Sequence, residues 1–149
     1  MEVVFRDINV TLINFSFNFS ERILNLANIS IQKHEIGNRG AILVRGMTLT
    51  KGQTKTMFVD NKNTSINTLC IKDAHLNSIS EISNTCNGTS ETLIACPGTA
   101  DVYNCSIVEN GTRFKVTGAN FTGIEQKPDV RGPKVTLVKP NANSGNKNQ

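Results

Sequence analysis

An all-β sandwich of two packed sheets is the fold that the sequence predicts. Apolar and polar residues alternate over many short stretches, as in half-buried strands, where successive side chains point to opposite faces. Clusters of turn-forming residues separate these stretches at fairly even spacing, which favours a sandwich. No stretch combines a helical period with convincing caps. Beyond the N-terminal segment, the predicted strands cover residues 23–33, 40–50, 54–60, 66–72, 91–96, 102–108, 113–119 and 134–139.

The N-terminal segment, residues 1–19, reads as strand with one irregularity. Its apolar alternation slips by one residue near Leu12 and Ile13, as happens at a β-bulge. Beyond the slip, phenylalanine alternates strictly with polar residues, so one face of the strand is expected to enter the core. The aromatic members of that face are Phe15, Phe17 and Phe19.

The clearest local prediction is a hairpin around Asn110 and Gly111, a dipeptide suited to the positive φ angles of a tight turn. Its strands are 102–108 and 113–119. Residues 20–27 could instead form one helical turn with Ser20 as its cap. The remaining predicted turns lie at residues 37–40, 51–52, 60–61 and 97–98.

Composition divides the chain into three parts. Residues 1–19 are the N-terminal strand segment and residues 20–126 the β-sandwich domain. Residues 127–149 combine a linker rich in proline and glycine, a terminal strand and an Asn-rich polar tail. That tail is expected to be disordered unless a neighbouring subunit holds it.

The cysteines predict two disulfides. Their count is even, they cluster in one part of the chain, and their spacing contains no C-x-x-C pair, so disulfides in an oxidising compartment fit better than zinc. Four buried free thiols are the alternative. Of three connectivities we favour Cys70–Cys86 with Cys96–Cys105, because a strand pair with a short loop brings such neighbours within bridging distance.

N-glycosylation acceptor triplets are the strongest functional signal. The chain has 19 Asn, 15 Thr and 10 Ser, from which about three N-x-[S/T] triplets are expected by chance. Nine occur, which predicts a heavily glycosylated extracellular or cell-surface protein. An Asn- and Thr-rich strand surface that creates triplets by accident is the alternative, and it leaves the fold unchanged. The acceptors are Asn9, Asn14, Asn18, Asn28, Asn63, Asn87, Asn104, Asn110 and Asn120.

Composition also argues against several other functions. The net charge of +4 is spread along the chain and there is no Trp, so a basic groove with stacking platforms for nucleic acid is not expected. The sequence contains no run of roughly 18 apolar residues, the length that a membrane-spanning helix needs. Only His34 and His75 could serve a His-dependent mechanism, and a Cys70–His75 pair fails once Cys70 is bridged. No acid pair, phosphate loop or calcium loop stands out. The prediction is a non-enzymatic protein without cofactor or metal.

Short motifs dispersed over residues 50–126 carry a family resemblance. They are Lys51-Gly52-Gln53-Thr54-Lys55-Thr56 with Phe58-Val59-Asp60, Leu69-Cys70-Ile71-Lys72-Asp73, Ile79-Ser80-Glu81-Ile82-Ser83 with Cys86, Cys96-Pro97-Gly98, Tyr103-Asn104-Cys105, and Asn110-Gly111-Thr112 with Phe114-Lys115-Val116-Thr117-Gly118. In these motifs the chain resembles the immunoglobulin-like β-sandwich repeats of archaeal secreted surface and filament glycoproteins. Residues 135–140 resemble the first strand of a following module. The resemblance implies an immunoglobulin-like topology, a surface location and an architectural role. It does not extend to the first fifty residues, and a jelly-roll-like topology remains the alternative.

Two functions are compatible with these features. In the first, the chain is a subunit of an extracellular filament or sheath, and its N-terminal strand is exchanged to complete a sheet of the next copy. The subunit contacts would then be Phe15, Phe17 and Phe19. In the second, it is a bead-like module of a tandem-repeat adhesin or surface-layer protein, in contact with adjacent modules. A carbohydrate- or receptor-binding module is a third class, against which the lack of Trp counts.

Overall fold

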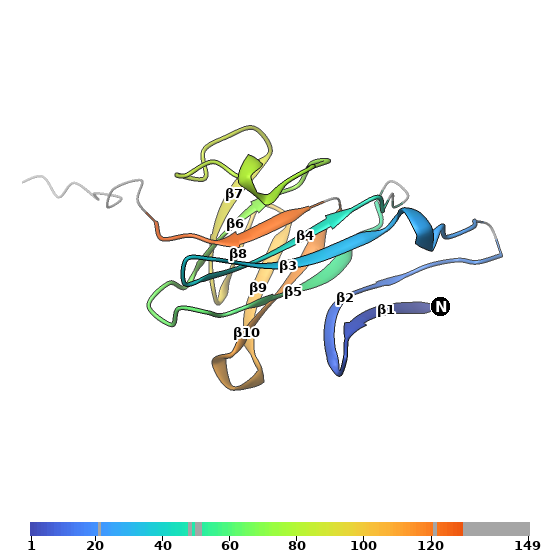
Figure 1. Ribbon diagram of the computed structural model, residues 1–149, viewed down its shortest axis with the longest axis horizontal. Helices are drawn as coiled ribbons and strands as arrows, with labels where there is room; N and C mark the ends of the chain where they lie inside the picture. Colours follow the sequence, from blue (N-terminus) through green and yellow to red (C-terminus); the bar gives the residue numbers. More distant parts are fainter. Residues whose placement is uncertain (21, 48, 50–51, 121, 130–149) are drawn as a thin grey trace, which may run out of the picture.

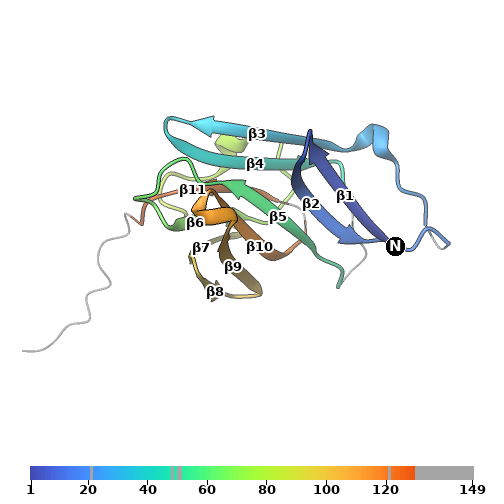
Figure 2. The same ribbon diagram turned by 90° about the horizontal axis from the view of Figure 1, so that it is seen from below.

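The computed structural model describes residues 1–20, 22–47, 49, 52–120 and 122–129. Figures 1 and 2 show two antiparallel sheets packed face to face, which confirms the predicted all-β sandwich. One sheet has six strands in the order β1-β2-β5-β10-β9-β8, and the other has five in the order β3-β4-β11-β6-β7. The strands are β1 (Glu2–Asp7), β2 (Val10–Ser16), β3 (Ser30–Ile36), β4 (Arg39–Arg45), β5 (Lys55–Asp60), β6 (Thr68–Lys72), β7 (Glu91–Ala95), β8 (Gly98–Ala100), β9 (Tyr103–Val108), β10 (Arg113–Ala119) and β11 (Gly123–Gln126).

The main core fills the space between the two sheets. Val59 and Phe114 enter it from the six-stranded sheet and meet Ile42, Ile71 and Ile124 from the five-stranded sheet, all fully buried. Each such side chain contributes about 1.5–3 kcal/mol by leaving water. Buried and half-buried residues alternate along β5. This alternation is the pattern from which the strands of the sandwich were predicted.

A second apolar cluster covers the outer face of the five-stranded sheet. Residues 73–90 leave β6, pass over that face and return to β7 (Figure 1). They bury Leu76, Ile79 and Ile82 against Ala41 and Leu43 of β4. The short 3-10 helix η2 (Ile79–Glu81) lies in this cover, and a capping box between Ser78 and Glu81 begins it. The five-stranded sheet is therefore covered on both faces.

The N-terminal segment is a hairpin and not the single strand that the sequence predicted. β1 pairs with β2 over six residue pairs, and the chain reverses between Asp7 and Val10. Ile8 supports this reversal with a φ of 57°. The register passes from Phe5↔Ile13 to Arg6↔Thr11 and leaves Leu12 without a partner, which confirms the bulge expected near Leu12 and Ile13.

Most of the other predicted strands are present, with three differences. The strand predicted at 23–33 begins only at Ser30, because the residues before it include a 3-10 helix, η1 (Leu26–Asn28), which Asn25 and not Ser20 caps. The strand predicted at 40–50 ends at Arg45. β8 and β11 were not predicted. The strand predicted at 134–139 lies outside the described residues.

The predicted hairpin between β9 and β10 is confirmed. Arg113 faces Val108 in the register, and the turn between them contains the 3-10 helix η3 (Glu109–Gly111). Asn110 and Gly111 have φ values of 57° and 86°, which are the positive angles that the sequence predicted for this turn. The helices among the described residues are three-residue 3-10 turns, none of which could span a membrane.

Candidate functional site at the N-terminal hairpin

The hairpin β1–β2 joins the rest of its sheet through a very short ladder. β2 pairs with β5 only at Ile13↔Met57 and Asn14↔Thr56. By comparison, β10 pairs with β5 at five positions and β3 pairs with β4 at seven. Main-chain hydrogen bonding therefore contributes little to the attachment of the hairpin, and other contacts must hold it.

Buried side chains supply most of that attachment. Ile13, Phe15 and Phe17 are 0%, 3% and 2% exposed and belong to the main core. The ring of Phe5 on β1 stacks on that of Phe15 at 6.3 Å between centroids. The Arg22 guanidinium lies 5.2 Å from the ring centroid of Phe17, a cation–π contact. The hairpin is held as a set of side chains seated in the core.

Phe19 departs from the predicted pattern. It was expected to enter the core with Phe15 and Phe17, but 48% of its surface is exposed. The reason is that β2 ends at Ser16, so the strict alternation of a strand does not continue to residue 19. Its ring still lies 4.7 Å from that of Phe17. Of the three proposed subunit contacts, this is the one on the surface.

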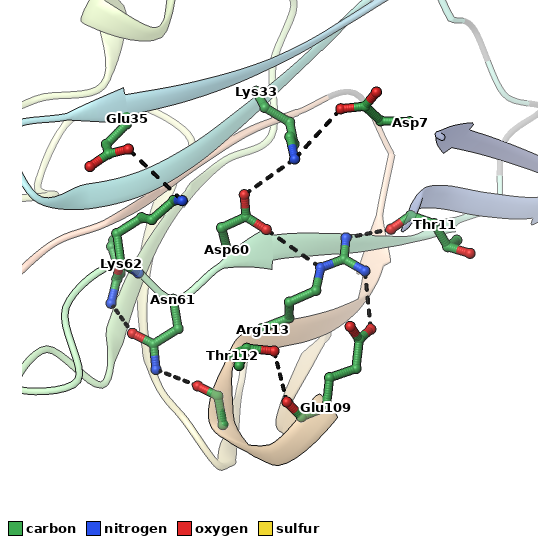
Figure 3. A network of polar contacts seen from close by, with 12 residues as sticks. Asp7, Thr11, Lys33, Glu35, Asp60, Asn61, Lys62, Glu109, Thr112 and Arg113 are labelled. Carbon is green, nitrogen blue, oxygen red and sulfur yellow. Dashed lines mark hydrogen bonds and ion pairs between the residues drawn. The ribbon is translucent and has the colours of Figure 1, made fainter. Parts of the chain in front are cut away.

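A polar network surrounds the junction between the hairpin and the sandwich (Figure 3). Arg113 of β10 is buried, and its guanidinium donates to the main-chain oxygen of Thr11 on β2. The same group forms ion pairs with Asp60 at 3.5 Å and with Glu109 at 3.1 Å. One buried arginine thus connects the hairpin, β5 and the β9–β10 turn.

Lys33 of β3 adds a second connection at the rim of this network. Its Nζ lies 3.7 Å from a carboxylate oxygen of Asp7 at the end of β1 and 3.4 Å from one of Asp60 on β5. Both pairs are partly exposed to solvent. Exposed ion pairs contribute about 0–1 kcal/mol each, so Lys33 adds little to the attachment of the hairpin.

The nine acceptor asparagines are distributed over several surfaces of the molecule. Asn14 and Asn104 lie on the outward face of the six-stranded sheet, because the core residues next to them point inwards. Asn9 is in the β1–β2 turn. Those exposed to solvent are Asn9, Asn18, Asn28, Asn87, Asn104 and Asn110, and those half-buried are Asn14, Asn63 and Asn120. Three of the nine, Asn9, Asn14 and Asn18, belong to residues 1–19.

Both disulfides have the pairing that the spacing favoured. Cys70–Cys86 joins β6 to the cover over the five-stranded sheet, with 5.6 Å between Cα atoms. Cys96–Cys105 joins the end of β7 in one sheet to β9 in the other, with 5.3 Å between Cα atoms. The described residues contain no free cysteine. With Cys70 bridged, the Cys70–His75 pair that the sequence analysis weighed is not available for nucleophilic catalysis.

Glu91 is the polar anchor of the cover. Burial raises its pKa, but hydrogen bonds from the side chain and backbone of Ser83, from the backbone of Gly88 and from Lys72 outweigh burial and lower the pKa to about 2. Its carboxylate lies beside the sulfurs of Cys70 and Cys86. Because these sulfurs are bonded to each other, they offer no thiolates to a metal.

No family model, curated protein or solved structure matches the chain.

Only some of the residues at the junction between the hairpin and the sandwich could be predicted from the sequence. The aromatic alternation pointed to Phe15 and Phe17, whereas Arg113, Asp7 and Lys33 come from three distant strands and no local motif connects them. The site that results is a hairpin seated by side chains at one end of a covalently braced sandwich.

Proposed function

We propose that this chain is a structural subunit of an extracellular filament or sheath, N-glycosylated, in which copies are joined by exchange of the β1–β2 hairpin. The observation that carries the proposal is the contrast within this hairpin. It shares two residue pairs with β5, yet it inserts Ile13, Phe15 and Phe17 into the main core. Such an element can leave its own sheet and be replaced by the same element of a copy.

The physics of strand addition supports this reading. Main-chain hydrogen bonds provide affinity, and alternate side chains in pockets provide specificity. The hairpin of a neighbour would make the same contacts as the chain's own hairpin, so exchange costs little beyond the entropy of association. Beyond Phe17, which moves with the hairpin, the connection to β3 is residues 18–29, and its described residues contain only a 3-10 turn. Twelve residues can span about 40 Å when extended, which leaves room for exchange.

The surface chemistry supports an extracellular location. Two disulfides indicate an oxidising compartment. Six of the nine acceptor asparagines are exposed, and glycans on them would shield an assembled polymer from proteases and from unwanted edge pairing. The resemblance of residues 50–126 to repeats of archaeal surface and filament glycoproteins points in the same direction.

A bead-like module of a tandem-repeat adhesin or surface-layer protein is the second candidate. The observation in its favour is that a single chain already seats Phe15 and Phe17 in its own core, so the fold needs no neighbour to be complete. In that case the hairpin stays in place and adjacent modules of the same chain are the partners.

Truncation and complementation distinguish the two candidates. A chain lacking residues 1–19 should remain monomeric under conditions in which the full chain forms filaments visible by electron microscopy. A fluorescent peptide of residues 1–19, present during refolding, should bind this truncated chain and restore its main core. A matched peptide with Phe15→Ser and Phe17→Ser should bind at least about tenfold more weakly. Unchanged assembly of the truncated chain, or equal binding of both peptides, would overturn the filament proposal.

A further inference from the structure

Lys55 is a buried lysine inside the sandwich. It is the first residue of β5, points into the core side of the six-stranded sheet and is only 2% exposed. Lysine is almost never fully buried unless its ammonium group has a partner. Partners of Lys55 Nζ are therefore expected inside the sandwich.

The groups around it come from the residue after β6, from β9 and from the β10–β11 corner. Lys55 Nζ donates to the main-chain oxygen of Asn120. The Asp73 carboxylate accepts from the backbone N–H of Asn120 at 3.2 Å and from the Thr122 hydroxyl at 2.9 Å. It also accepts from the Tyr103 hydroxyl at 2.9 Å. An amine, a carboxylate and an asparagine thus meet in one place.

The register of the sheet brings the amine to this asparagine. Ala119 at the end of β10 is the partner of Lys55 on β5, so Asn120 follows directly after the residue opposite the lysine. Asn120 is half-buried, and its side-chain oxygen Oδ1 is buried without a hydrogen-bond partner among the described residues. A buried carboxamide oxygen in this state is costly, and one explanation for it is that the carboxamide reacts.

Burial also acts on the protonation state of Lys55. Burial lowers the pKa of Lys55 to about 7, although the charge of Asp73 acts in the opposite direction. A large fraction of the group is therefore a neutral amine near neutral pH, and only the neutral form has the lone pair that nucleophilic attack requires.

We propose that Lys55 and Asn120 form an intramolecular isopeptide bond, with Asp73 as the group that moves the proton. The Nζ lone pair attacks Cγ of Asn120, and a proton passes from Nζ to the Asp73 carboxylate. Asp73 returns that proton to Nδ2, the Cγ–Nδ2 bond breaks, and ammonia leaves. The product is a secondary amide between Nζ and Cγ, so the reaction needs no oxidant, reductant or activating co-reactant.

The bond would link β5 covalently to the β10–β11 corner. β5 is the strand against which the N-terminal hairpin is seated, so the receiving side of the junction would be fixed. The same reaction would remove Nδ2 of Asn120, the atom to which a glycan attaches. Asn120 would then be an acceptor asparagine that carries a cross-link instead of a sugar. The inference does not depend on whether the hairpin exchanges.

Mass spectrometry of the folded full chain tests the proposal, with protein from a host that forms disulfides and lacks N-glycosylation. After reduction and alkylation, the intact mass should be about 17 Da, the mass of one ammonia, below the mass expected for the sequence with four alkylated cysteines. Because cyclisation of an asparagine causes the same loss, the decisive species is a branched tryptic peptide that joins residues 52–62 to residues 116–131.

Three variants serve as controls. Lys55→Arg and Asp73→Asn should each yield folded protein that has lost no ammonia and gives no branched peptide. Lys127→Arg should retain the branched peptide, because Lys127 is also buried but pairs with Glu125 at 3.4 Å. Circular dichroism verifies that each variant is folded. A folded unmodified chain whose digest contains residues 52–55 and 116–131 as separate linear peptides overturns the proposal.

Discussion

The N-terminal hairpin and the sandwich that receives it are held together by different means. The hairpin has two residue pairs with β5, a few buried side chains and no cysteine. The sandwich has a five-pair ladder between β5 and β10, two disulfides and a cover over its second sheet. Ladder pairs and pockets for side chains can both be supplied by another copy, but an element with a short ladder leaves its own sheet more easily than one with a long ladder or a disulfide. In the proposed filament, the hairpin is therefore the part that copies exchange.

The largest effect is expected from truncating one aromatic residue in each region. Phe114→Ala and Phe15→Ala should each remove about 3–5 kcal/mol of stabilisation, because both rings are buried in the main core. In the Phe114 variant, hydrogen exchange should accelerate in both sheets. In the Phe15 variant, it should accelerate mainly in β1, β2 and β5, since the hairpin can open by itself. Equal loss of protection throughout the Phe15 variant would contradict the comparison.

Removing a disulfide should weaken the sandwich without releasing the hairpin. The double variant Cys96→Ser/Cys105→Ser leaves no single free thiol at this site and should lose about 2–4 kcal/mol through the loss of loop constraint. Thermal unfolding measures this loss, and sedimentation should show assembly unchanged, because neither cysteine belongs to the hairpin. An unchanged melting temperature would count against a structural role for this bridge.

Acid should weaken the cover over the five-stranded sheet through Glu91. Its pKa is lowered from 4.5 to about 2 in the folded chain, so its contribution is fully present above pH 4.5 and is lost as the pH falls towards 2. Glu91→Gln should cost about 1.5–3 kcal/mol at neutral pH, since the hydrogen bonds to Ser83, Gly88 and Lys72 lose their charge. Stability curves of the two proteins should converge across that pH window, and parallel curves would rule out Glu91 as the titrating group.

The smallest effect is expected from the exposed pairs at the rim of the junction. Lys33→Ala removes the contacts to Asp7 and Asp60 and should change stability by less than about 1 kcal/mol. Salt at high concentration should abolish even this difference, because it screens exposed charges. A larger, salt-resistant loss would mean that Lys33 anchors the hairpin, in contrast to the role assigned to it here.

Sequence reasoning succeeded where one residue type determines the local structure. Asn110 and Gly111 predicted their turn because few dipeptides tolerate positive φ angles at both positions. The alternation of the strands at 54–60 and 113–119 predicted β5 and β10 because each has one inward face. The slip near Leu12 predicted the bulge because an extra residue shifts which side chains of the strand face inwards.

Sequence reasoning failed where tertiary contacts replace the local signal. β11 is buried throughout, and its Glu125 and Gln126 are satisfied by partners from distant segments, Arg39 and Asn61 among them. No alternation remains for a pattern to detect. β8 is three residues long, too short for any period. The inward-facing Lys55 and Arg113 look like surface residues in the sequence, because only the fold reveals that Asp73 and Asp60 lie beside them.

Whether the hairpin crosses between copies can be measured with a pair of cysteines. Asn14 and Thr56 face each other across the β2–β5 junction, at the distance of a cross-strand pair, about 5 Å between Cβ atoms. In the variant Asn14→Cys/Thr56→Cys, material assembled and then oxidised should run as a ladder of covalent multimers on non-reducing gels. The single variant Thr56→Cys and the matched variant Asn14→Ser/Thr56→Cys should give no ladder. If the double-cysteine chain stays monomeric, or assembles with bridges only within each chain, hairpin exchange does not occur.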